Sequence, residues 1–149
     1  MSTAPEVHQV ADIHDLLSLL ELKGIKFFEV SGRLVTDPRE DTTDFGMEVV
    51  QRQTPETFEP RFKMTVTSPQ ADYVIDVASR YESPEPIAFS PQLAAEFIER
   101  VAVMAVFPFL REGLASSASR LEVPVPILGL LRPGQFKIEL KEEVASGEE

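Results

Sequence analysis

The sequence has no cysteine, no tryptophan and only two histidines. The absence of cysteine excludes disulfides, thiolate metal ligands and cysteine nucleophiles. His8 and His14 lack the i,i+4 spacing of a helical metal site, so we expect two solvent-facing residues. The longest apolar run, Val101–Leu110, has ten residues and contains Pro108, which excludes a transmembrane helix. No basic residue precedes an apolar run at the N-terminus, so we expect no signal peptide.

What is present is enough apolar material for one core, since 43% of the 149 residues are hydrophobic and ten are phenylalanine. Acidic residues outnumber basic ones by 25 to 14, which gives a formal net charge of −11. Such a charge repels phosphate backbones and anionic lipid and favours basic protein partners. We therefore expect a cytoplasmic protein that binds no nucleic acid and does not insert into membranes.

Hydrophobic periodicity predicts a single α+β domain over residues 10–138, after a disordered N-terminus (1–9) and before an acidic flexible tail (139–149). Strand patterns predict a four-stranded antiparallel sheet that includes one hairpin. The apolar face reverses at Lys23-Gly24, which predicts a bulge in the first strand. The predicted elements of this part are a helix over Val10–Leu20, a strand over Glu21–Val35, a strand from Phe45 to about Gln53, and the hairpin between Phe58 and Tyr81.

A long helix is predicted from Pro91 to about Arg120, with Ser90 as its N-cap and a kink at Pro108. Its first half is amphipathic, whereas Val101–Leu110 is apolar on every side and needs cover on every side. One sheet covers only one side of a helix, so we expect a second subunit on the other. The residues predicted for this subunit interface are Val101, Val103, Met104, Val106 and Leu110.

The segment after this helix, Leu121–Gly134, combines three prolines with a series of large aliphatic residues. The prolines exclude a regular helix or a central strand. An extended apolar segment of this kind either packs over the protein's own hydrophobic surface or is offered to a partner.

Motifs that would indicate catalysis are missing from the sequence. Ser116, Ser117 and Ser119 lack the G-x-S-x-G context of a nucleophile, and no glycine-rich phosphate loop occurs. We therefore expect neither an enzyme nor a cofactor. The surplus of apolar residues favours a binding protein.

The stretch Val106–Arg120 reads VFPFLREGLASSASR and is followed by Pro124, Pro126 and Leu128. It resembles the signature segment of the SecB protein-export chaperones, and the hairpin FKMTVTSPQADYVIDVASRYE is similar to theirs. The resemblance covers about residues 20–135. It implies a four-stranded antiparallel sheet with a long helix, in a homotetramer built as a dimer of dimers with the long helices between the sheets.

The resemblance also implies an activity, which is ATP-independent holding of unfolded or export-bound polypeptides in hydrophobic grooves of the oligomer. In the family, the loop after the long helix lines or covers those grooves. In this sequence the client-binding residues are then Phe107, Phe109, Leu121, Val123, Val125, Ile127, Leu128, Leu130 and Leu131.

The family also docks on the SecA translocation motor through an acidic sheet face, which the resemblance places here at Val74 and Asp76. Lys23 and Lys26 stand where further acidic residues are expected, and this departure argues against docking. The N-terminal helix resembles an extension of divergent SecB-like chaperones linked to toxin–antitoxin systems. Two alternatives stay open: a dedicated chaperone of an antitoxin or another single client, and a non-chaperone oligomeric scaffold whose loop seals its own core.

Overall fold

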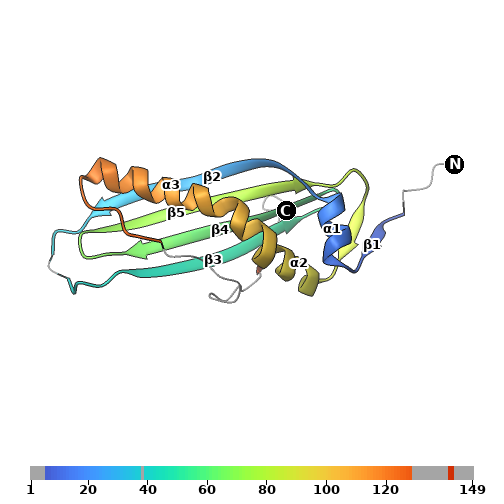
Figure 1. Cartoon of the computed structure of the whole chain (residues 1–149), viewed down its shortest axis with the longest axis horizontal. Coiled ribbons are helices and arrows are strands. Elements are labelled where there is room, and N and C mark those ends of the chain that lie inside the picture. The colour runs from blue at the N-terminus through green and yellow to red at the C-terminus, as the bar shows by residue number, and fades with distance from the viewer. Residues whose placement is uncertain (1–5, 38, 129–140, 143–149) are drawn as a thin grey trace, which may run out of the picture.

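The computed structural model describes residues 6–37, 39–128 and 141–142. It has two layers, an antiparallel sheet and a long helix that runs across one face of it (Figure 1). We call the covered side of the sheet the helix face and the opposite side the outer face. The expected α+β class is confirmed.

Four long strands form the sheet in the order β2-β5-β4-β3, so β2 lies at one edge. All neighbouring pairs of these four are antiparallel, as predicted. The two-residue strand β7 (Lys141–Glu142) adds to β3 in parallel at the other edge and is the described part of the expected tail. The four strands are β2 (Glu21–Leu34), β3 (Asp44–Gln53), β4 (Thr57–Thr67) and β5 (Ala71–Glu82).

Two irregularities interrupt the pairing of β2 with β5. One lies between Leu22 and Gly24, which confirms the predicted bulge, and the other between Phe27 and Glu29. A bulge adds one unpaired residue to a strand and redirects its neighbours. At the second bulge the extra residue is Phe28, which lies on the outer face, while Phe27 reaches the helix.

The two central strands carry the core by simple alternation. Phe62 and Met64 of β4 are fully buried on the helix face, whereas Lys63 between them is exposed. The same alternation buries Tyr73 and Ile75 of β5. Period-two patterning is therefore a sufficient guide to the face that each residue takes in these strands.

The long helix runs without a gap through α2 (Pro91–Phe97), η1 (Ile98–Ala102) and α3 (Val103–Leu121). Ser90 caps it as predicted, because its hydroxyl oxygen accepts a hydrogen bond of 3.1 Å from the Leu93 N–H. Its C-terminal cap is Glu122, which has a positive φ of 58°.

A π-turn, η1, interrupts the α-helical hydrogen bonding between α2 and α3. Pro108 has no N–H to donate to the Met104 carbonyl, and the kink expected there stays a prediction. Pro108 lies inside α3, on an exposed part of the helix. A π-turn contains one extra residue and so shifts the buried stripe along the sequence. Ala102 and Val103 are consequently buried, whereas Val101, which we expected at the subunit interface, is half-buried.

The N-terminal residues differ from the prediction in one respect. His8 and Gln9, which we expected to be disordered, belong to β1 (His8–Val10), and this strand pairs in parallel with β6 (Ile87–Phe89). The predicted N-terminal helix is present but shorter, as α1 (Ile13–Leu19), with Asp12 as its cap. β1 pairs with β6, which lies far from it in the sequence. Local hydrophobic patterns cannot predict a pairing of this kind.

The helix lies very close to the sheet at Gly113. A Cβ atom at this position would stand 2.9 Å from Ile75 Cγ2, which is inside van der Waals contact. Among the described helices, none is long and apolar enough to cross a membrane.

Candidate functional site

The loop after α3 is both anchored and exposed. Val123 and Leu128 pack against the core, whereas Val125 is 46% and Ile127 is 87% exposed. The two interpretations of this segment therefore hold for different residues, since some seal the core and others face outward. Leu130 and Leu131, also expected to contact clients, lie outside the described residues.

The aromatic residues of the signature lie at the helix surface. Phe109 is 37% exposed and meets Phe27 of β2 edge to face, with ring centroids 6.2 Å apart. Phe107 is half-buried, and the Arg111 guanidinium lies 5.7 Å from its ring centroid. Leu121 is half-buried over Gly32 of β2, where an added Cβ would meet its Cδ1 at 3.1 Å.

Sequence reasoning missed an apolar strip along β2. These side chains point to the helix face, but they belong to an edge strand, and α3 leaves much of each uncovered. Their alternation was visible in the sequence, whereas the position of the strand at the edge was not. The strip consists of Leu22, Phe27, Val30 and Leu34, each between 37% and 49% exposed.

The five expected subunit-interface residues separate into two groups. Val103, Val106 and Leu110 are buried in this chain's own core, so their side chains face the sheet and not a partner. For these three the expectation is corrected, because the sheet already occupies that side of the helix. Met104 is 56% exposed and Val101 is half-buried, so both remain at the helix surface.

Asp76 is not the exposed acid that motor docking requires. It points to the outer face as expected, but it is only 3% exposed. Arg61 on the neighbouring strand covers it, with hydrogen bonds of 2.9 Å from Nε to Oδ1 and from Nη2 to Oδ2. Val74, the second predicted docking residue, is half-buried on the same face. The negative charge of the Asp76 carboxylate is therefore already balanced by Arg61. The sequence alone could not show this pairing, because it depends on the register between the two strands.

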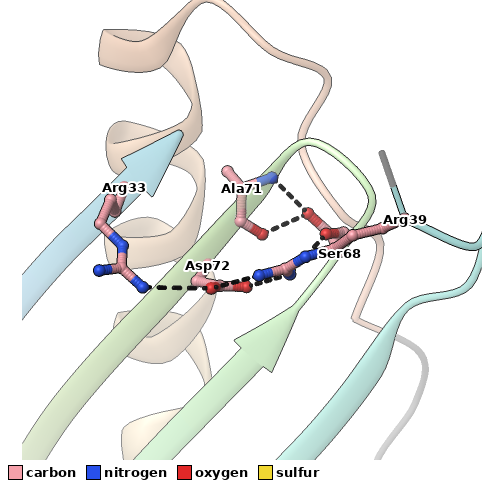
Figure 2. A network of polar contacts seen from close by, with 5 residues as sticks. All are labelled: Arg33, Arg39, Ser68, Ala71 and Asp72. Carbon is pink, nitrogen blue, oxygen red and sulfur yellow. Dashed lines mark hydrogen bonds and ion pairs between the residues drawn. The ribbon is translucent and has the colours of Figure 1, made fainter. Parts of the chain in front are cut away.

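A second ion-pair network joins the end of β2, the connection between β2 and β3, and the β4–β5 turn (Figure 2). Arg39 donates hydrogen bonds of 2.7 and 3.0 Å to the two carboxylate oxygens of Asp72, and one of 3.2 Å to the Ser68 carbonyl. Arg33 approaches the same carboxylate at 3.7 Å. The hydrogen bonds from Arg39 hold the pKa of Asp72 below its usual value, with the charges of Arg39 and Arg33 adding to the effect.

Groups for chemistry are sparse in the described part of the chain. No cluster of three or more histidine or acidic side chains there is arranged to hold a metal ion. His8 lies 3.2 Å from Glu85, with both side chains about half exposed. What the described surface offers instead is apolar side chains on β2, on α3 and on the loop.

Comparisons with known proteins agree with this description. No protein-family model matches the chain. The chain is 35% identical over 127 residues to the SecB-like chaperone SmegB of Mycolicibacterium smegmatis, which covers 85% of this chain and 86% of the relative.

Among solved structures, the fold matches the Mycobacterium tuberculosis SecB-like chaperone Rv1957, solved in complex with a ChAD peptide from the HigA1 antitoxin. The TM-score is 0.67 at 16% identity, over 79% of this chain and 91% of the other. The sequence match confirms the resemblance and the chaperone function that it implied. The chain therefore belongs to the SecB-like chaperones.

Proposed function

We propose that this chaperone holds unfolded or export-bound polypeptides without ATP, in the cytoplasm, on an apolar surface that includes Phe109, Val125 and Ile127. The observation that carries the proposal is the loop, whose anchors at Val123 and Leu128 fix it while Ile127 between them is 87% exposed. An aliphatic side chain that faces solvent between two residues packed on the core has no role in sealing that core.

The energetics fit reversible holding. Full burial of a large apolar side chain is worth about 1.5–3 kcal/mol. Part of the free energy from a few such contacts is offset by the entropy lost on association, so the net affinity is moderate and binding is reversible. Contacts with side-chain bulk alone discriminate little between sequences. The formal charge of −11 keeps such a surface soluble and attracts basic unfolded segments.

We further propose that the functional form is a homo-oligomer, most simply the homotetramer that the family resemblance implies. Met104 of α3 and Val101 of η1 are apolar residues at the surface of the long helix near its middle. A second helix packed over them would cover the side that the sheet does not reach. The proposal involves no catalytic step.

A dedicated client is the second candidate. The M. tuberculosis protein of similar fold was solved with an antitoxin peptide, which supports an antitoxin as client here. The covered state of Asp76 favours this candidate over a partnership with the SecA motor, because a neutralised acid offers little to a basic partner. Clients and motor are distinguished by titrating each against the chaperone.

The test of the holding surface is suppression of aggregation of a chemically unfolded reporter protein. The double substitution Val125→Ser and Ile127→Ser should weaken suppression several-fold and leave the melting temperature almost unchanged. The control is Leu17→Ser, which removes from α1 an aliphatic side chain about as exposed as Val125. If Leu17→Ser costs as much activity as the loop variant, the loop is not the holding surface.

The breadth of clients needs a separate experiment. A panel of unrelated unfolded reporters and an antitoxin peptide should be titrated against the same preparation. Protection of most reporters at similar chaperone concentrations indicates a general holdase. Protection of the antitoxin alone indicates a dedicated chaperone.

A further inference from the structure

A short parallel pairing holds the N-terminal strand β1 on the body of the protein. Val10 of β1 is aligned with Phe89 of β6. Two positions earlier, the His8 N–H donates a hydrogen bond of 2.9 Å to the Pro86 carbonyl. β1 lies at the end of the molecule where the long helix begins, away from the C-terminal end of α3 (Figure 1). The pairing is therefore separate from the start of the loop that follows α3.

The core holds β6 firmly in place. Ile87 is 3% exposed, and its N–H donates a hydrogen bond of 2.9 Å to the Pro55 carbonyl in the β3–β4 turn. The Phe89 ring meets the fully buried Phe58 edge to face, with ring centroids 5.2 Å apart. The edge of β6 that faces β1 is therefore a fixed template on which an extended segment can add as a strand.

β1 itself makes few contacts with the core. Val10 is the one buried side chain of its three residues, whereas His8 and Gln9 are exposed. The His8 ring lies 3.2 Å from the Glu85 carboxylate at the surface. Such an exposed contact adds little, and one buried valine has to offset the backbone entropy of three ordered residues. β1 should therefore open from β6 by local unfolding, while the sheet stays folded.

The contacts that β1 makes define what can replace it. The backbone of β6, including the Pro86 carbonyl, requires an extended segment in parallel orientation. The position of Val10 beside Phe89 requires an aliphatic side chain. The Glu85 carboxylate favours a lysine or arginine two positions before it, because these carry a full charge where histidine is only partly protonated. A pattern this short occurs in most unfolded polypeptides.

We propose that the edge of β6 is a strand-addition site for an extended segment of a client polypeptide, and that β1 is its internal competitor. The segment places a basic residue where His8 lies and an aliphatic residue where Val10 lies. The inference rests on the proposed function, because an unfolded client supplies extended segments. Two residues join β1 to α1, so the effective concentration of β1 at β6 is about millimolar. A client that is also held elsewhere on the chaperone competes with β1 at a similar effective concentration.

The first variant opens the site in the full chain. His8→Pro removes the N–H that bonds to the Pro86 carbonyl, together with the contact to Glu85, and it removes no buried side chain. The matched control is Val7→Pro, which places a proline one residue earlier, at an exposed position, and keeps the His8 N–H. Thermal melts should show that both variants fold like the wild type.

The probe is a labelled hexapeptide, Ala-Val-Lys-Gln-Val-Ala, titrated by fluorescence anisotropy. It follows residues 7–11 with lysine in place of histidine, after one added alanine. His8→Pro should bind it at least tenfold more tightly than the wild type and Val7→Pro do, because β1 no longer competes. A peptide with serine in place of its second valine should lose this binding, since it lacks the aliphatic anchor.

A pair of charge variants tests the basic position of the ligand. Glu85→Gln, made in the His8→Pro protein, should weaken binding of the lysine peptide several-fold. Glu56→Gln makes the same charge change at an exposed acid of the β3–β4 turn and should alter binding by about twofold at most. Equal losses would mean that the peptide is attracted by the net charge of the chain, which would overturn the assigned site.

The proposal fails if His8→Pro and the wild type bind the peptide equally. It also fails if light scattering shows a lower mass for His8→Pro, because β1 would then be exchanged with a second copy of the chain. The client is tested directly, since His8→Pro should suppress aggregation of an unfolded reporter at lower concentration than Val7→Pro does, and equal suppression would exclude clients from the site. Ile127→Ser tests the loop on its own, so a failure at β6 is distinguished from a failure of the proposed function.

Discussion

Arg61 and Asp76 form a two-point ion pair across adjacent strands, and the two partners differ greatly in exposure. The side chain of Asp76 is 4% exposed and that of Arg61 is 30% exposed. The arginine therefore covers the acid and keeps contact with water itself. Because of this difference, removing Arg61 and removing Asp76 should change the stability of the protein by different amounts.

Arg61→Met should destabilise the protein more than Asp76→Asn does. The first variant leaves a buried carboxylate without its counterion, at a cost of roughly 2–4 kcal/mol. The second leaves a guanidinium that water already reaches, at a cost of about 1–2 kcal/mol. Urea unfolding monitored by circular dichroism measures both. Equal losses would mean that the carboxylate has another source of stabilisation.

Stability should fall in acid as Asp72 becomes protonated. Arg39 lowers the pKa of Asp72 below the ordinary value of 3.8, so the folded state binds fewer protons than the unfolded state in that range. The contribution is therefore fully present above the ordinary pKa and is lost as the pH falls through the lowered one. In Arg39→Gln the pKa of Asp72 should rise toward 3.8.

The measurement is the free energy of unfolding between about pH 5 and about pH 2, which is the range over which such a group titrates. The wild-type protein should lose more stability over this range than Arg39→Gln does. Parallel curves for the two proteins would show that the Arg39–Asp72 contact does not couple to folding.

Gly113→Ala should destabilise the protein although alanine is the better helix former. Alanine gains about 1 kcal/mol of helix propensity, but its Cβ would stand 2.9 Å from the buried Ile75. Overpacking of this kind costs about 1–3 kcal/mol. Ser119→Ala, on an exposed turn of the same helix, is the control and should be neutral or slightly stabilising. A Gly113→Ala protein as stable as this control would contradict the close approach.

Met104→Asp should reduce the oligomer to smaller species without unfolding the chain. Met104 is 56% exposed in the single chain, so a charge there meets only water until a partner covers it. Val106→Asp should instead prevent folding, because Val106 is fully buried in the chain's own core. Light scattering gives the mass and circular dichroism the fold. Leu17→Asp is the exposed control, and an unchanged mass for Met104→Asp would exclude the helix surface from assembly.

Neighbouring residues of the loop should respond differently to the same substitution. Leu128→Ser should lower the melting temperature by several degrees, because Leu128 packs against the core. Ile127→Ser should leave it unchanged, because Ile127 is 87% exposed. Differential scanning calorimetry of the two variants checks this. Equal melting temperatures would mean that the loop does not close the core at all.

Most of the fold could be predicted from local patterns. Period-two alternation located the strands, and the bulge at Lys23-Gly24 appeared as a change of apolar face. Ser90 followed by Pro91 marked the start of the long helix. These features depend on residues within a few positions of one another.

The candidate site was predictable only in part, because its remaining features depend on distant neighbours. The exposed strip that includes Phe27 follows from the edge position of β2, and the covered state of Asp76 follows from its register with Arg61. The loop contained both packed and exposed residues, and proline spacing did not distinguish Ile127 from Leu128. Alternation predicts the face of the sheet to which each side chain points, but not which other residues cover that side chain.

The π-turn at Ile98–Ala102 has a consequence for insertions and deletions. A π-turn holds one residue more than a regular α-helix, so deleting one residue here would close the turn into an α-helix. Val106 and Leu110 would keep their place on the sheet together with Phe97. A deletion at the exposed position Arg100 should therefore be tolerated better than a deletion elsewhere in the helix, where it would rotate the following residues by about 100°.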